Sequence, residues 1–185
     1  MTKIFIGGSR HVSRLSAQVR KRIDNIIAKG FPILVGDANG ADKAVQSYLH
    51  SKHYANVEVF CSEGQCRNNI GNWEVRHVPA DTRDRSAHFY SAKDRAMTHE
   101  ADIGLMVWDG KSAGTLLNAM RLIGLRKKVV VYVVPDKQFR EFRHHDEWET
   151  FFANCNAELR RKVEQRASRE IRSGDPALQT TLPTF

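Results

Sequence analysis

The chain has 185 residues, which suits one domain of the common size of roughly 100–200 residues and excludes two large domains. Hydrophobic residues make up 41% and charged residues 27%, so the chain holds enough apolar side chains for a core and is not wholly disordered. The formal charge is +8, and the excess lies in residues 1–135, which hold 20 Lys and Arg against 12 Asp and Glu, while residues 136–185 hold 9 of each.

Apolar runs and helical periodicity alternate along the first 134 residues. The runs predict strands at residues 3–7, 33–35, 57–60, 103–108 and 128–134. Apolar side chains at helical spacing predict helices at residues 15–29, 41–53, 83–100 and 116–123. This alternation predicts a Rossmann-like, doubly wound α/β fold with a mostly parallel sheet of about five strands. Residues 61–81 show no clear periodicity, and so long a loop in a compact domain is more often functional than idle.

The composition changes near residue 136, which divides the chain into three parts. Residues 1–135 form the Rossmann-like domain. Residues 136–172 are predicted to be a helical C-terminal extension outside the core, because residues 156–172 are rich in charge and poor in apolar side chains. Residues 173–185 contain glycine and two prolines and are predicted to be a poorly ordered tail.

Several classes of protein are disfavoured by what these residues lack. No apolar run approaches the roughly 18 residues of a membrane span, and the first residues do not follow the signal-peptide pattern, so we expect a cytoplasmic protein without a membrane partner. Cys61, Cys66 and Cys155 are odd in number and lack a CxxC spacing, which predicts reduced thiols. The histidines have no recognisable metal spacing either, so no metal site is expected.

Three strand ends carry glycine-rich loops, and parallel strands would bring these loops to one edge of the sheet. The candidate ligand-binding residues are Gly8, Ser9 and Arg10 in the first loop, Gly36, Asp37, Asn39, Gly40, Asp42 and Lys43 in the second, and Gly110, Ser112, Gly114 and Thr115 in the third. Glycines admit a ligand to the backbone, amides at a helix start bind anions, and arginine fits phosphate. The alternatives are a structural turn in the first loop and helix capping in the second. Neither a Walker loop nor a GxGxxG fingerprint is present, which disfavours kinases and dehydrogenases.

Other polar residues are predicted to lie near these loops. Asp109 is the candidate catalytic residue because it follows the fourth strand, although it can equally bind a sugar hydroxyl or cap the turn. Lys93 is a candidate phosphate ligand, with a solvated lysine as the alternative. Arg67, Asn68 and Asn69, followed by Trp73, are a candidate lid over the ligand, with a loop that satisfies its own backbone as the alternative.

Together, the three loops and the Ala101-Asp102 dipeptide resemble the SLOG superfamily over about residues 3–134. This superfamily includes the LOG phosphoribohydrolases, the DNA-processing protein DprA and small bacterial YspA/YpsA-like proteins. The resemblance implies a Rossmann-like fold that binds a nucleotide or a nucleotide-derived ligand, with the Gly114-Thr115 loop on its phosphate. It also implies a homo-oligomer.

One position departs from the LOG enzymes of that superfamily. In those enzymes the Gly-Thr loop is followed by a catalytic glutamate, whose place is taken here by Asn118. Lys93-Asp94 stands where they have an Arg-Lys pair, whereas Met97 matches. Because an amide does not ionise, it cannot act as a general base, and the change puts LOG-type hydrolysis in doubt.

Three functions remain open from the sequence. The leading one is binding of a nucleotide-type ligand, such as NAD, ADP-ribose or a nucleoside monophosphate, either as a sensor or with slow cleavage of its N-glycosidic bond. No other cofactor is indicated. The second is DprA-like binding of nucleic acid, which the basic body favours. The third is a non-enzymatic interaction protein that docks through its C-terminal helix.

Overall fold

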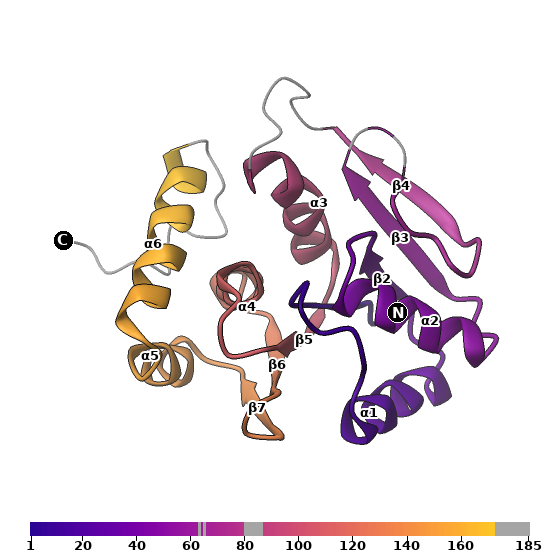
Figure 1. The fold of residues 1–185 in the computed structure, drawn as a ribbon, viewed down its shortest axis with the longest axis horizontal. Coiled ribbons are helices and arrows are strands. Elements are labelled where there is room, and N and C mark those ends of the chain that lie inside the picture. The colour runs from indigo at the N-terminus through magenta and orange to yellow at the C-terminus, as the bar shows by residue number, and fades with distance from the viewer. Residues whose placement is uncertain (63, 65, 80–86, 173–185) are drawn as a thin grey trace.

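A computed structural model describes residues 1–62, 64, 66–79 and 87–172, with the side chains of residues 87–90 and 172 left out (Figure 1). The predicted helix start at residues 83–86 and the predicted tail at 173–185 therefore lie outside the described residues. No helix in the described ranges is both long enough and apolar enough to cross a lipid bilayer.

The described residues form one sheet of seven strands with helices on both faces. The strands are β1 (Ile4–Gly8), β2 (Ile33–Gly36), β3 (Val57–Ser62), β4 (Glu74–Val78), β5 (Ile103–Trp108), β6 (Lys128–Val133) and β7 (Gln138–Phe142). The helices are α1 (Ala17–Ala28), α2 (Ala41–Ser51), α3 (Ala87–Glu100), α4 (Ala113–Gly124), α5 (His145–Ala153) and α6 (Ala157–Arg172). All pairs are parallel except β6 with β7, which confirms the predicted α/β Rossmann-like fold class.

Two edge strands extend the predicted sheet of about five strands to seven. β4 lies within residues 61–81 and is largely polar and exposed, so it lacks an apolar run; Arg76 on β4 pairs with Glu58 on β3 at 2.7 Å. β7 lies in the extension that was predicted to be helical, and its Phe139 packs against Tyr132 of β6. Edge strands with one exposed face give weaker sequence signals than buried parallel strands.

The strand order β4-β3-β2-β1-β5-β6-β7 reverses direction between β1 and β5. From β1 the chain adds strands toward β4, and it then crosses to the other side of β1 to form β5 and β6. The apolar side chains of α1 and α2 share one core cluster, while those of α3, α4, α5 and α6 share the other. The reversal point between β1 and β5 is where open α/β sheets place their ligands.

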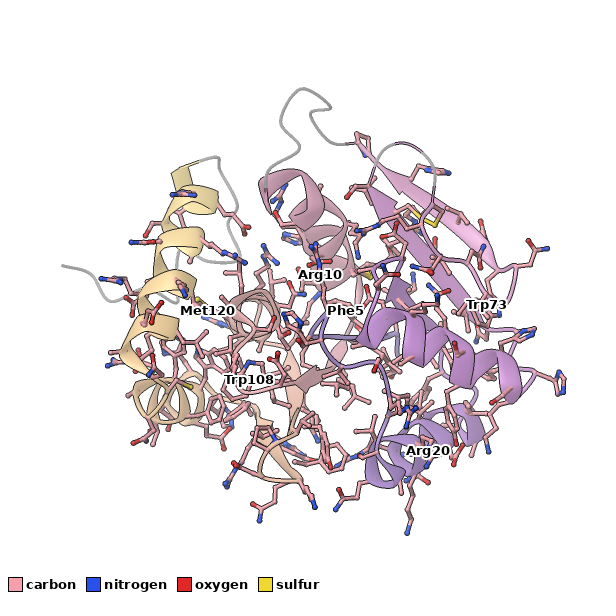
Figure 2. The ribbon with its side chains drawn as sticks, in the orientation of Figure 1. Phe5, Arg10, Arg20, Trp73, Trp108 and Met120 are labelled. Carbon is pink, nitrogen blue, oxygen red and sulfur yellow. A yellow bond between two sulfur atoms is a disulfide. The ribbon has the colours of Figure 1, made fainter. Side chains whose placement is uncertain are left out.

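The C-terminal extension packs on the core instead of standing outside it. Trp148 of α5 is 1% exposed, and Leu159, Val163 and Ala167 of α6 are buried in the same cluster as Met120 of α4. Figure 2 shows Met120 and Trp108 on the side of the molecule that carries α5 and α6, far from Trp73. The few apolar residues of α6 recur every four positions, so they form one narrow stripe that is enough to pack this charged helix against the core. The boundary at residues 135 and 136 remains a prediction.

Candidate functional site

A cavity of about 910 Å³ opens at the carboxyl ends of β1 and β5. It gathers residues from all three glycine-rich loops, the second contributing only Ala38 and Asp42, and from α3, α4 and α6. The predicted site residues that line it are Gly8, Arg10, Asp42, Lys93, Asp109, Ser112, Gly114 and Thr115. The predicted site residues that do not line it are Ser9, Gly36, Asp37, Asn39, Gly40, Lys43, Arg67, Asn68, Asn69 and Gly110.

Asp109 joins the first and third loops at the cavity wall. Its Oδ2 accepts a hydrogen bond from the Ser9 hydroxyl at 2.8 Å, and its Oδ1 accepts from the backbone N–H groups of Lys111 and Ser112 at 3.0 and 2.8 Å. Partial burial raises the pKa of Asp109, but these hydrogen bonds outweigh it and hold the pKa below its ordinary value. A carboxylate that is ionised and accepts hydrogen bonds on both oxygens fits a structural link between the two loops better than it fits a proton donor.

The first turn of α4 meets the cavity without a side-chain cap. Ser112 is the N-cap residue, but its hydroxyl accepts a hydrogen bond from Thr115 Oγ1 at 3.1 Å instead of capping the backbone. The N–H groups in the first turn of a helix have no acceptor within the helix itself. Gly114 lies in this turn, and a Cβ added to it would meet no atom closer than 3.8 Å. The third loop therefore presents backbone donors and free space to the cavity.

Lys93 is buried at the floor of the cavity among three carboxylates. Its Nζ lies 3.3 Å from Asp42, 3.4 Å from Asp94 and 3.6 Å from Asp37. Burial alone would lower the pKa of Lys93, but the three carboxylates raise it above its ordinary value, so the ammonium stays charged. Burial raises the pKa of Asp42, against the attraction of Lys93. The alternative of a solvated lysine is not the one observed, because only 3% of the Lys93 side chain is exposed. Its role as a phosphate ligand remains a prediction.

Two glycines of the second loop make room for the protein's own atoms. A Cβ on Gly36 would collide with Lys93 Nζ and the Asp42 carboxylate, so the ion pair needs a glycine below it. Gly40 has a φ of 84°, and a Cβ there would collide with the backbone of Arg10. These contacts give both glycines a packing reason that does not involve a ligand.

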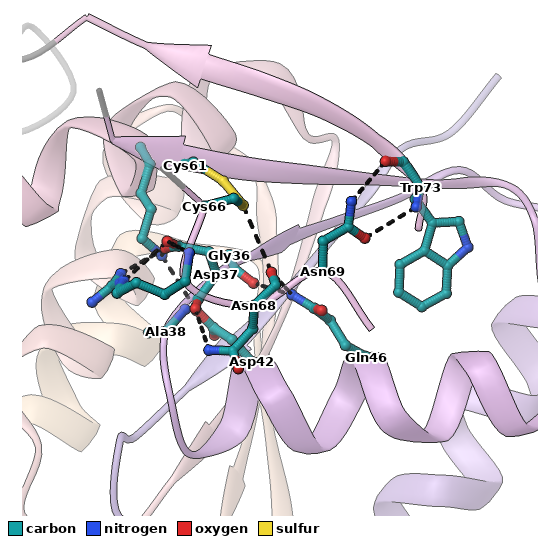
Figure 3. Close-up of a disulfide and its surroundings, with 12 residues drawn as sticks. Gly36, Asp37, Ala38, Asp42, Gln46, Cys61, Cys66, Asn68, Asn69 and Trp73 are labelled. Carbon is teal, nitrogen blue, oxygen red and sulfur yellow. Dashed lines mark hydrogen bonds and ion pairs between the residues drawn. A yellow bond between two sulfur atoms is a disulfide. The ribbon is translucent and has the colours of Figure 1, made fainter. Parts of the chain in front are cut away.

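The predicted lid does not lie over the cavity. Arg67 donates to Asp37 from Nε at 2.9 Å, from Nη2 at 2.6 Å and from its backbone N–H at 3.1 Å. Asn68 donates to the Asp37 carbonyl and to Asn39. Asn69 exchanges hydrogen bonds with the backbone of Trp73 (Figure 3). Burial raises the pKa of Asp37, but Arg67 and Lys93 together bring it below its ordinary value. The alternative in which this loop satisfies its own groups is the one observed.

Cys61 and Cys66 form a disulfide, so the prediction of reduced thiols is wrong for this pair. The two Cα atoms lie 5.5 Å apart, a proximity that a spacing of five residues does not reveal. Figure 3 shows the disulfide beside Asp37. Asp37 places a carboxylate oxygen within 4.8 Å of both sulfurs, in a group that resembles a metal site. Both sulfurs are bonded to each other, however, and the carboxylate is held by Arg67. Cys155 is a free thiol.

The disulfide predicts a reductant-sensitive stability. Because it closes a short loop, its reduction is expected to lower the free energy of unfolding by roughly 2 kcal/mol through the entropy of the unfolded chain. Urea denaturation with and without dithiothreitol measures the difference. The same difference should persist in Cys155→Ser and vanish in the Cys61→Ser/Cys66→Ser double variant. An equal effect of dithiothreitol on the double variant would contradict the assignment.

The sequence did not predict a buried network of hydrogen-bonded polar side chains that joins α4 to α6. Arg121 donates to Glu170 from Nε at 3.0 Å and from Nη2 at 2.6 Å, and it also donates to Asn118 Oδ1. Asn118 donates in turn to Asp94 at 3.3 Å. Arg121 falls within the otherwise apolar pattern of α4, and a charge at such a position is the one sequence signal that indicates a buried partner.

Comparison with known proteins supports the fold and no closer relationship. No family model and no curated protein sequence matches the chain. The structure is similar to a solved structure of DNA processing protein A from Helicobacter pylori, which was described for its single-stranded DNA binding mode. The TM-score is 0.51 and the sequence identity 18%, and the match covers 70% of this chain and 64% of the Helicobacter pylori chain. At that identity the likeness shows that the two chains share an α/β Rossmann-like fold.

Proposed function

We propose that this chain is a SLOG-type protein that binds a nucleotide or a nucleotide-derived molecule in the cavity at the ends of β1 and β5. The observation that carries the proposal is the place of the cavity, which lies at the reversal point of the strand order and is lined by the first and third loops. Ligands of open α/β sheets bind at this point. A volume of about 910 Å³ also lies in the range of roughly 300–1,000 Å³ of small-molecule sites.

The third loop is the proposed phosphate site. The uncapped first turn of α4 offers backbone N–H donors and the positive end of the helix dipole, and Gly114 leaves space for a phosphoryl group. Arg10 and Lys111 add positive charge to the same cavity. The ligand class is therefore a nucleoside phosphate, of the nucleoside monophosphate, NAD or ADP-ribose type.

Binding without LOG-type hydrolysis is the better-supported role. Asn118, which stands where LOG enzymes have their glutamate, is held between Asp94 and Arg121 and has no ionisable group. Asp109 is ionised and has hydrogen bonds on both oxygens. Neither residue supplies a free carboxylate to a glycosidic bond, which supports a sensor or carrier.

Mass spectrometry of the purified protein is the first test. The protein is denatured and any released small molecule is identified, and the native protein is then incubated with AMP, NAD and ADP-ribose. We expect a bound or retained intact nucleotide. Release of free base and ribose phosphate would show that the protein is a glycosidase, and absence of both binding and cleavage would reject the proposed site.

A substitution in the third loop should separate binding from folding. Gly114→Glu is expected to weaken AMP binding by roughly 10-fold or more, because its carboxylate repels the phosphate from the helix start. The same carboxylate favours the α4 N-terminus by about 0.3–1 kcal/mol, so the fold should not lose stability. Gly114→Gln is the matched control for bulk, and calorimetric titration measures both variants. Equal affinities of the two variants would contradict a phosphate at this position.

Binding of single-stranded nucleic acid is a second candidate, favoured by the charge of +8 and by the fold shared with DNA processing protein A. It predicts that the chain binds oligodeoxythymidylate with an affinity that falls steeply as salt rises. Fluorescence anisotropy at several salt concentrations measures this dependence. Failure to bind at low salt would remove this candidate.

A further inference from the structure

Helix α6 supplies one wall of the cavity, although it lies outside the alternating strands and helices that predict the site. Arg166, Arg169 and Glu170 of this helix line the cavity. A Cβ added to Gly114 would lie 3.8 Å from Nη1 of Arg166, so the guanidinium stands over the first turn of α4. The α6 wall therefore faces the proposed phosphate site directly.

Burial and an ion pair fix the orientation of α6. Leu159, Val163 and Ala167 form a buried stripe along the helix, and Glu170 is held by the buried guanidinium of Arg121. Arg166 and Arg169 lie three residues apart, about one helical turn or 4.5 Å along the axis, and so share a side of the helix. The anchored stripe thus holds both exposed guanidiniums toward the cavity.

Among the residues that the structure describes, the acidic side chains that line the cavity are all paired, whereas several of its basic side chains are not. Its carboxylates all have partners: Asp42 and Asp94 pair with Lys93, Asp109 accepts three hydrogen bonds, and Glu170 pairs with Arg121. Within the described residues, Lys111, Arg166 and Arg169 have no ion-pair partner. The cations that remain free favour an anionic ligand, and a guanidinium fits phosphate oxygens in a two-pronged contact.

We propose that α6 is a phosphate-binding element, in which Arg166 and Arg169 hold the phosphoryl group of an organic phosphate against the first turn of α4. This inference rests on the proposed function and deepens it. It assigns the ligand's phosphoryl group to a site built jointly by the Rossmann-like sheet and the C-terminal extension. The extension is thereby part of the binding site and determines that the protein selects phosphorylated ligands over nucleosides.

Calorimetric titration with AMP, ADP-ribose and adenosine tests the assignment. The variants are Arg166→Ala, Arg169→Ala and their combination, and Arg161→Ala, an exposed α6 residue that does not line the cavity, is the matched control. We expect the combined variant to bind AMP and ADP-ribose about 10- to 100-fold more weakly, because charge-assisted hydrogen bonds are lost. Adenosine binding should not change. Arg166→Lys should give an intermediate loss, since it keeps the charge and loses the fork.

The outcomes separate this inference from the proposed function. If the wild-type protein binds AMP or ADP-ribose and the combined variant binds it equally well, the role of α6 is wrong and the proposed function stands. If the wild-type protein binds neither, both are wrong. If neither nucleotide binds and the combined variant loses only binding of oligodeoxythymidylate, the arginines belong to a nucleic-acid surface and the small-molecule assignment is overturned. If the combined variant keeps the circular dichroism spectrum and the melting temperature of the wild-type protein, loss of fold is excluded as the cause of weaker binding.

Discussion

Lys93→Met is expected to lower the free energy of unfolding by about 3–5 kcal/mol, the usual cost of removing one partner of a buried ion pair. The substitution keeps most of the side-chain volume and removes the ammonium that lies within 3.6 Å of Asp37, Asp42 and Asp94. Arg67 still neutralises Asp37, but Asp42 is left buried without a cation. Lys43→Met, an exposed position on α2, is the matched control and should change stability by no more than about 0.5 kcal/mol.

The loss in Lys93→Met should also depend on pH. Burial already raises the pKa of Asp42, and removing Lys93 removes the attraction that opposes this rise. The ordinary pKa of an aspartate is 3.8, and the pKa of Asp42 in the folded protein lies above it. As pH rises from the first value through the second, the unfolded chain releases this proton more readily than the folded protein does, so the free energy of unfolding falls. The cost is therefore expected to be smaller near pH 4 than near pH 7. Urea denaturation at both pH values measures it, and an equal loss at both would show that Asp42 is not the destabilised group.

Glu170→Ala is also expected to lower the free energy of unfolding by about 3–5 kcal/mol, because it leaves the buried guanidinium of Arg121 without a carboxylate partner and with only the amide of Asn118. Arg121 is 1% exposed and Glu170 is 4% exposed, so little water reaches the guanidinium to replace the lost carboxylate. Replacing both partners with apolar residues of similar size, as in Arg121→Met/Glu170→Leu, should restore most of the loss.

A double-mutant cycle measures the Arg121–Glu170 interaction: the free energies of unfolding of Arg121→Met, Glu170→Leu and the combined variant are compared with that of the wild-type protein by urea denaturation. The pair Glu158 and Lys162 on the same helix is the control, since both side chains are more than half exposed, at 63% and 57%. Its disruption by Glu158→Ala should cost no more than about 0.5 kcal/mol. Additive losses in the Arg121→Met/Glu170→Leu variant would contradict a coupled buried pair. A loss in Glu170→Ala as small as that in Glu158→Ala would show that α6 is not anchored by this contact.

Local patterns were sufficient for the fold class and for predicting that the loops after β1 and β5 meet at one edge of the sheet. Continuous valines at 129–131 indicate a strand buried on both faces, and the apolar stripe of α1 indicates an amphipathic helix. Both signals arise within a few residues, so they can be read without knowing the fold. The same holds for the loops after β1 and β5, because parallel strands bring their carboxyl ends to one edge of the sheet. Gly8, Gly114 and Thr115 accordingly line one cavity, as the sequence predicts.

Contacts between segments that are distant in the sequence decided which charged residues are buried and paired, and how the remaining elements pack. Lys93 is buried because α3 brings it to carboxylates 51 and 56 residues earlier, and Arg67 turns from a predicted ligand contact into the partner of Asp37. The polar edge strand β4, the Cys61–Cys66 disulfide and the seating of α6 on α4 likewise depend on how the chain returns to itself. The sequence determined the elements and the loops at the sheet edge, because secondary structure follows local periodicity. Only the tertiary structure decided which charges are buried and paired, because an ion pair depends on proximity that no local pattern encodes.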